Sequence, residues 1–356
     1  MARVFLVLAG TLLGVILAEW ACRAFWPCEI HGYAYEPPQK ALFRHDPDLG
    51  WVGRPGAAGT FAGTDFSVTV RLDSLGNRNS VPPHRDGARN TLLVGDSFPW
   101  GWGVEMEDAV GAAMMRVDPS VHVYSLAAPG YGPDQSLLSL ERFLEDAPGT
   151  FDSCVSFVFV GNDFDDISAV RRYGMAKPQF RLDGAGVLSL QNVPVSDADG
   201  AFFDEERSLD TLPYLDLGIW NRFHLFNRLV TRPRIRRTRS LMDSRRSHRA
   251  DPVVDPALRE RRQAEARSLM GAILARMDQR LRDAGIRHVA VVLYETAPDP
   301  RLEFMRQFLD SRAIPHVALG RDETSWRSRY LCCDPHLNAH GHATLAREVL
   351  HLLEDG

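Results

Sequence analysis

The stretch Thr91-Leu92-Leu93-Val94-Gly95-Asp96-Ser97-Phe98 joins an apolar run to a glycine-containing turn and then to a serine. The apolar run predicts a buried β-strand, so that Ser97 stands at its carboxyl-terminal tip. In an α/β fold, this is where a nucleophilic hydroxyl is exposed and where backbone N–H groups face a developing negative charge. A turn with Asp96 or Ser97 as a helix N-cap is the alternative that this stretch alone leaves open.

Two further strand-like runs end in turns of small residues. The run 121–124 precedes a turn that contains Gly130, and the run 154–160 precedes Gly161-Asn162-Asp163. The carboxyl ends of parallel strands meet along one edge of an open sheet, where ligands bind. The Gly130 N–H can approach a ligand closely, and the Asn162 amide can donate a second hydrogen bond. A loop glycine and an Asx turn are the structural alternatives.

The segment Asp-Pro-His-Leu-Asn-Ala-His-Gly-His at 334–342 offers three imidazoles. A serine hydroxyl needs a base within hydrogen-bond reach, and that base needs an acid that fixes its tautomer. We assign His336 as the base and Asp334 as the acid, with His340 and His342 as competitors for the base. Two histidines four residues apart can also bind a metal, but Gly341 interrupts the helix that would present them. We therefore expect neither a metal nor a cofactor.

Together, Gly95-Asp96-Ser97, Gly130, Gly161-Asn162-Asp163 and Asp334-x-His336 resemble the four sequence blocks of the SGNH, or GDSL-type, hydrolase superfamily, in particular its membrane-anchored bacterial members. The resemblance covers about residues 90 to 353. It implies an α/β fold, a flavodoxin-like three-layer α/β/α sandwich with a central parallel sheet. It also implies Ser97 as nucleophile, His336 as general base and Asp334 as its orienting acid. The implied oxyanion hole consists of the Ser97 N–H, the Gly130 N–H and the Asn162 side chain.

One position departs from the family pattern. The family places the acid three residues before the histidine, where this chain has Cys333, and Asp334 is only two residues before His336. The shorter spacing resembles that of some membrane-associated relatives, including the alginate O-acetyltransferases. The turn 73–78 likewise resembles an Asn-Ser-x-Gly-x-Arg segment that precedes the nucleophile strand in membrane-anchored bacterial members.

The amino-terminal segment is strongly apolar. Residues 4–18 carry no charge, Arg3 precedes them, and aromatic residues extend the apolar character to Trp26. This pattern predicts a single-pass signal anchor with Arg3 on the cytoplasmic side and the rest of the chain outside the cytoplasm. A cleaved signal peptide, which would leave a secreted protein, and a buried core helix are the alternatives.

The remaining chain divides into an extension at 29–90 with a small β element and a hydrolase domain at 91–356, after the anchor at 1–28. An insertion at about 165–252 interrupts the hydrolase domain and is expected to form the substrate wall. Periodicity and turn residues predict further elements: helices at 105–118, 133–146, 215–230, 256–284, 301–311 and 339–353, strands at 66–72 and 288–294, and a hairpin within 177–195.

Composition allows one large core in the 356 residues, of which 45% are hydrophobic. The net charge of −5 gives no indication of a nucleic-acid partner. We interpret the arginine-rich run at 232–249 as a solvated linker rather than a contact with an anionic surface.

The five cysteines suit no disulfide framework, and Cys332-Cys333 is either a vicinal disulfide or a pair of reduced thiols.

The resemblance implies a serine esterase that removes an acyl group from a glycan or a small molecule. Transfer of that acyl group to a sugar hydroxyl is one alternative, and a catalytically idle binding or assembly protein is another. Trp100, Trp102 and Tyr131 flank the predicted site, where aromatic side chains can hold a sugar or an acyl chain. We expect these three to contact the substrate, with packing between helices and sheet as the alternative.

Overall fold

The computed structural model describes residues 1–25, 28, 39–63, 66–147, 149–172, 175–196, 220, 222–233, 256–321, 327–332 and 334–354. The arginine-rich run beyond Pro233 and much of the predicted insertion lie outside these ranges. The helix predicted at 215–230 is described only in part, and is helical from His224 to Thr231.

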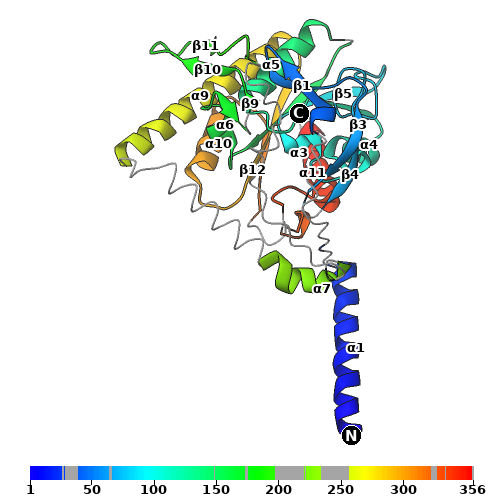
Figure 1. Ribbon diagram of the computed structural model, residues 1–356. Helices are drawn as coiled ribbons and strands as arrows, with labels where there is room; N and C mark the ends of the chain where they lie inside the picture. The colour runs from blue at the N-terminus through cyan, green and yellow to red at the C-terminus, as the bar shows by residue number, and fades with distance from the viewer. Residues whose placement is uncertain are drawn as a thin grey trace.

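A five-stranded parallel sheet lies at the centre of the molecule (Figure 1). Its strands are β5 (Arg89–Val94), β6 (Val121–Ser125), β7 (Ser153–Phe159), β12 (Arg287–Tyr294) and β13 (His316–Gly320). They run in the order β13-β12-β7-β5-β6. This is the strand order of flavodoxin-like doubly wound sheets, in which the order reverses beside the first strand. The predicted α/β fold class is therefore confirmed.

Helices cover both faces of the sheet because its strands are apolar on both sides. On β12, Val289 and Val291 pack into one core layer while Ala290 and Val292 pack into the other. The helices that contribute to the first layer are α4 (Val110–Val117) and α11 (Ala339–Glu354). Those of the second are α5 (Pro133–Glu145), α9 (Pro256–Asp283) and α10 (Pro300–Ser311).

Shorter elements complete the described chain. The single-turn helices are α2 (Gln39–Leu42), α3 (Ser97–Trp100), η1 (Met106–Asp108), α6 (Asp163–Asp166) and η4 (Arg327–Arg329). The antiparallel hairpins pair β1 (Phe43–Asp46) with β2 (Gly50–Gly53), β3 (Ala58–Ala62) with β4 (Ser67–Arg71), β8 (Arg171–Arg172) with β9 (Met175–Ala176), and β10 (Gln179–Leu182) with β11 (Leu188–Gln191). The helix predicted at 105–118 is interrupted, because extended Ala109 packs against Gly101 between η1 and α4.

The amino-terminal extension is attached to the end of β6 by the turn that follows β4. Asp73 accepts hydrogen bonds from the N–H groups of Leu75 and Asn77 at 2.8 and 2.9 Å, and from the Tyr124 hydroxyl at 2.7 Å. Asn79 bonds both backbone groups of Ser125, at 2.8 and 3.0 Å. The turn therefore holds the extension against the sheet at the edge where β6 ends.

Helix α1 (Ala2–Phe25) has a mean hydropathy of 2.1 in its most apolar window, and none of its residues is buried (Figure 1). Such a helix fits a signal sequence or a signal anchor. At its carboxyl end lie α7 (His224–Phe226) and the π-helical turn η3 (Asn227–Thr231).

A disulfide joins Cys28 to Cys332, whose Cα atoms are 5.4 Å apart and which are separated by 304 residues. Our expectation for the Cys332-Cys333 pair was therefore wrong, because Cys332 is neither reduced nor bonded to its neighbour. The folded chain brings the segment after α1 next to the loop that carries His336, and sequence spacing alone does not reveal such a long-range approach.

We expect that replacing Cys332 by Ser lowers the free energy of unfolding by about 2 to 5 kcal/mol, because the bond restricts the unfolded chain across a long loop. Thermal unfolding of the full-length protein in detergent, with and without a reductant, measures this effect. Cys22→Ser removes a free cysteine and serves as the control. Equal midpoints for wild type and Cys332→Ser under oxidising conditions would contradict the expectation.

Candidate active site

Ser97, His336 and Asp334 form a hydrogen-bonded chain at the carboxyl edge of the sheet. The Ser97 Oγ lies 2.7 Å from His336 Nε2. The other ring nitrogen of His336 pairs with the Asp334 carboxylate, which also accepts the His336 backbone N–H at 3.0 Å. An Asp-x-His spacing therefore suffices for the acid to reach Nδ1 in this chain, although the acid stands one residue closer than in the family pattern.

The local backbone brings Ser97 to the end of β5. Gly95 has a φ of +148°, and a Cβ there would lie 2.9 Å from side-chain atoms of Phe157 and Pro99. Only glycine accommodates both the conformation and the close approach. Asp96 then caps α3 by accepting the Phe98 N–H at 3.0 Å. The N-cap alternative is thus realised by Asp96, while the role of Ser97 as nucleophile stays a prediction.

Asn338 holds the loop that carries His336. Its side-chain amide donates to the carbonyls of Ser328 and Tyr330, at 2.9 and 3.0 Å, and its Oδ1 accepts the Gly341 N–H at 2.9 Å. A bridge between Tyr330 and Leu337 closes the loop. Our sequence reasoning did not single out Asn338, although an asparagine directly before a helix is a common N-cap signal.

The structure separates the three histidines of this segment. His336 alone among them bonds to Ser97. His342 is buried inside α11, where burial lowers its pKa to about 3. His340 is exposed on the same helix. Neither of the two competitors therefore stands where a base for Ser97 must stand.

Aromatic rings cover His336. The Trp102 ring stacks on the imidazole at 5.1 Å between centroids, and the Phe98 ring lies at 4.8 Å. Trp100 and Tyr131 are buried in the core of the amino-terminal extension, where the Tyr131 hydroxyl donates to the Trp51 carbonyl at 2.6 Å. Of the three aromatic residues expected to contact substrate, Trp102 is thus in contact with the histidine, while the other two make packing contacts.

The residues expected to form the oxyanion hole follow three neighbouring strands. Gly130 has a φ of +77° in the loop after β6, a conformation that glycine adopts without strain. Asn162 follows β7, and its side-chain amide donates to Asp166 Oδ2 at 2.9 Å. This bond fixes the orientation of the Asn162 amide. The order reversal of the sheet lies between β5 and β7, where open α/β sheets bind ligands.

Three buried carboxyl groups, those of Asp96, Asp163 and Asp166, lie next to this edge. Burial raises the pKa of Asp166 to about 7. The pKa of Asp163 is raised well above its ordinary value, first by burial and then by the nearby Asp96 and Asp166 carboxyls. Asp163 accepts the Phe159 N–H at 2.8 Å, while its Oδ1 is buried without a partner. We interpret Asp96 and Asp163 as cap and turn residues, in agreement with these bonds.

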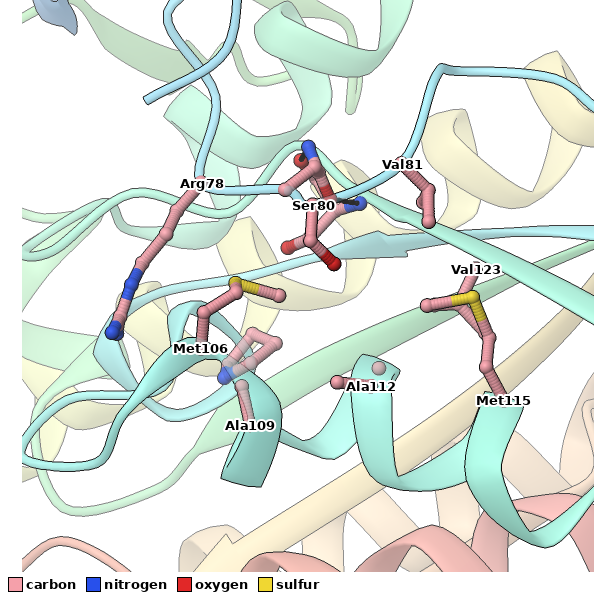
Figure 2. Close-up of a pocket in the computed structure, with 12 residues that line it drawn as sticks. Arg78, Ser80, Val81, Met106, Ala109, Ala112, Met115 and Val123 are labelled. Atoms are coloured by element: carbon pink, nitrogen blue, oxygen red, sulfur yellow. Dashed lines mark hydrogen bonds between the residues drawn. The ribbon is translucent and has the colours of Figure 1, made fainter. Parts of the chain in front are cut away.

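Arg78 fixes the chain that follows the candidate nucleophile. Its buried guanidinium donates to the carbonyls of Gly101 and Val104, at 2.6 and 2.8 Å, and lies 4.7 Å from the Trp100 ring. Burial lowers its pKa to about 10. Figure 2 shows Arg78 beside a small pocket lined by Met106, Ala112, Met115 and Val123, among others. Pro99 lines this pocket but neither Ser97 nor His336 does, so we do not assign the substrate site to it.

A second Ser-His-Asp chain lies inside the protein. Ser156 Oγ is 2.9 Å from His288 Nε2, and His288 Nδ1 is 3.4 Å from Asp278 Oδ1. Such a bond is consistent with serine hydrolase chemistry, but all three residues are buried and Ser156 lies within β7 rather than at its end. Asp278 also pairs with Arg282 and Arg312. We interpret this chain as a structural network, which our sequence reasoning did not find.

No protein-family model and no curated protein matches this sequence. Among solved structures, the fold is similar to the psychrotrophic esterase EstA from Pseudoalteromonas sp., in a structure inhibited by monoethylphosphonate. The two are 8% identical, with a TM-score of 0.37, and the match covers 76% of this chain and 98% of the esterase. A likeness of this size carries no argument about chemistry, so function rests on the geometry of the site.

We expect that Asp163→Asn makes stability less dependent on pH. Because the pKa of Asp163 is higher in the folded state, the folded state retains the proton to higher pH than the unfolded state does. The wild type therefore loses stability as the pH rises above the ordinary aspartate value of about 4, and the asparagine has no proton to lose.

Chemical denaturation of the full-length protein between pH 5 and pH 8 measures this difference. The free energy of unfolding should decrease more for wild type than for Asp163→Asn over this interval. Asp165→Asn, which alters an exposed neighbour, is the control and should follow wild type. Parallel curves for wild type and Asp163→Asn would show that the buried carboxyl does not titrate as we infer.

Proposed function

We propose that this protein is a membrane-anchored serine ester hydrolase of the SGNH type, acting outside the cytoplasm. The observation that carries the proposal is the 2.7 Å contact between Ser97 Oγ and His336 Nε2, with Asp334 on the other ring nitrogen. The arrangement stands at the carboxyl edge of a parallel sheet, where the fold places its ligands. The proposed substrate is an acyl ester, such as an acetyl ester, of a glycan or a small molecule.

In the proposed acylation step, His336 takes the Ser97 proton as the oxygen attacks the ester carbonyl. Asp334 orients the imidazole and stabilises the imidazolium that forms. The N–H groups of Ser97 and Gly130 and the amide of Asn162 would donate to the negative oxygen of the tetrahedral intermediate. When this intermediate collapses, the ester C–O bond breaks and the alcohol leaves with the proton from His336.

Water then completes the reaction. His336 takes a proton from a water molecule that attacks the Ser97 acyl ester, and returns it to the serine oxygen as the carboxylic acid departs. The Trp102 and Phe98 rings cover the imidazole and limit the directions from which water or another acceptor can approach it.

Two features support a location outside the cytoplasm. Helix α1 carries no charge from Val4 to Ala18 and has no buried residue, as expected of an anchor. The Cys28–Cys332 disulfide is of the kind that persists in oxidising compartments. We therefore keep the interpretation of an uncleaved single-pass anchor, because removal of α1 would also remove Glu19, whose carboxylate accepts the N–H groups of His224 and Leu225.

Transfer of the acyl group to a sugar hydroxyl is the second candidate. It is favoured by the Asp334-x-His336 spacing, which resembles that of membrane-associated acetyltransferases. The acylation step is the same for both, so that only the acceptor in the second step differs. The two functions are separated by adding a sugar acceptor to the acylated enzyme and measuring how the product divides between free acid and acyl sugar.

We expect a fluorophosphonate probe to form one adduct with the full-length protein in detergent, located on Ser97. Ser97→Ala should form none, because the buried Ser156 cannot reach the probe. Ser156→Ala is the matched control, since it removes the serine of the second Ser-His-Asp chain. Intact-mass spectrometry reads the adduct, and circular dichroism establishes that each variant is folded.

An adduct that persists in Ser97→Ala and disappears in a folded Ser156→Ala would assign the chemistry to the internal chain and refute the proposal. A folded wild type that forms no adduct would favour a catalytically idle binding or assembly protein.

We expect Asp334→Asn to lower kcat for p-nitrophenyl acetate by roughly 10²- to 10⁴-fold with little change in KM, because the neutral amide no longer orients His336 or stabilises its charged form. Steady-state hydrolysis by the full-length protein measures this. Asp310→Asn, at an exposed position on α10, is the control. Activity of Asp334→Asn within threefold of wild type would mean that another acid orients the histidine.

A further inference from the structure

The segment that contains α7 and η3, with Trp220 before it, buries polar residues and exposes apolar ones. Its uncharged polar residues Asn227 and Thr231 are both 0% exposed and His224 is 7% exposed, whereas Arg222 is exposed. Its apolar residues Trp220, Leu229 and Val230 are 56%, 69% and 42% exposed. A surface helix of a water-soluble domain has the opposite arrangement, with its apolar residues against the protein. The outer face of this segment is therefore suited to an apolar surrounding.

Polar contacts attach the segment to the end of α1. The Glu19 carboxylate accepts the N–H groups of His224 and Leu225, at 3.0 and 2.8 Å. The Arg23 guanidinium donates to the Arg222 carbonyl at 2.7 Å. The segment is thus docked onto α1 through its own backbone groups.

The same segment is attached to Cys28. The Cys28 N–H donates to His224 Nδ1 at 2.8 Å, and the Asn227 side chain donates to the Cys28 carbonyl at 2.9 Å. Because Cys28 is also bonded to Cys332, these contacts link the segment to the loop that carries His336. Figure 1 shows α7 extending sideways from the carboxyl end of α1, which is the end nearest the sheet domain.

The position of the docking site along α1 matches the boundary of a bilayer. At a rise of about 1.5 Å per residue, Glu19 lies about 26 Å from the first residue of the helix. The hydrocarbon core of a bilayer is about 30 Å thick. If α1 spans a membrane, as proposed above, the docked segment therefore lies near the level where hydrocarbon meets headgroups.

The outer face carries the residue types that this boundary favours. The rings of Trp220, Phe223 and Phe226 form a cluster, with centroids of Trp220 5.8 and 5.6 Å from the other two. Tryptophan and phenylalanine are favoured where the surrounding is apolar on one side and wet on the other. Arg222 is exposed next to this cluster, and the sequence after Thr231 continues with several arginines.

We propose that Trp220 and residues 222–233 lie in the membrane interface, with Trp220, Leu229 and Val230 inserted at the acyl boundary and Arg222 facing anionic phospholipid headgroups. This inference rests on the proposed membrane anchor. The interpretation of the arginine-rich run 232–249 as a solvated linker stays a prediction, because the run lies outside the described residues beyond Pro233. The bilayer then supports the loop that carries His336, through Cys28 and its disulfide to Cys332.

The first test places the photo-crosslinking residue p-benzoylphenylalanine at Leu229 of the full-length protein. The protein is reconstituted in nanodiscs with equal parts of phosphatidylcholine and phosphatidylglycerol. The matched control is Val187, which is 60% exposed in the turn between β10 and β11, a hairpin that lies far from α1 in Figure 1. Leu12 of α1 is the positive control. Irradiation followed by mass spectrometry should give lipid adducts at Leu229 and Leu12, and none at Val187.

Each other outcome overturns the proposal. A lipid adduct at Leu12 without one at Leu229 would support the membrane anchor and refute the interfacial position of the segment. The absence of adducts at both positions would refute both proposals. A cross-link from Leu229 to a second polypeptide would show that a protein covers this face instead of lipid.

A second measurement uses the native Trp220 and avoids an unnatural side chain. The emission lost in Trp220→Phe isolates the Trp220 signal, and nanodiscs of brominated phospholipid should quench most of it. Equal Trp220 emission in brominated and ordinary nanodiscs would contradict insertion. Fluorophosphonate labelling of Ser97 in the same preparations reports the proposed enzymatic function separately, so failure of one proposal is not mistaken for failure of the other.

Discussion

The hydrogen bond between Ser97 Oγ and His336 Nε2 joins two positions 239 residues apart, and much of the described structure holds its two ends. On the serine side, Gly95 and the Asp96 cap turn the chain sharply after β5. On the histidine side, Asn338 closes the loop against α11. A change of about 1 Å at either end would weaken the proposed proton transfer from Ser97 to His336, because such a transfer depends on a short contact between the two atoms.

The amino-terminal extension has a structural role in this arrangement. Arg78 donates from the extension to the carbonyls that follow α3, and its neighbour Asn79 pairs with the backbone at the end of β6. The extension therefore holds the chain that follows Ser97, and its Phe61 and Phe66 rings also pack against Trp102, the ring that stacks on His336.

Buried carboxyl groups near the candidate site lower the stability of the folded state. Asp163 and Asp166 are buried close to Asp96, and burial together with mutual repulsion raises the pKa values of Asp163 and Asp166. Burying several like charges is costly unless they are neutralised or paired. Asp166 pairs with Arg172 and accepts the Asn162 amide. The buried Asp166 carboxyl therefore lowers the stability of the folded state, but it also orients the Asn162 amide, which we propose binds the oxyanion.

The sequence by itself determined the α/β class, most helices and strands, and the residue types at the candidate site, because short apolar runs, glycine turns and helical periodicity are local signals. The tertiary structure decided which histidine meets Ser97, because only His336 is carried to the serine while His342 is buried in α11. It also decided that Cys332 bonds to Cys28, and it revealed the internal chain of Ser156. These are contacts between distant segments, and local patterns do not encode them because they depend on how the layers pack together.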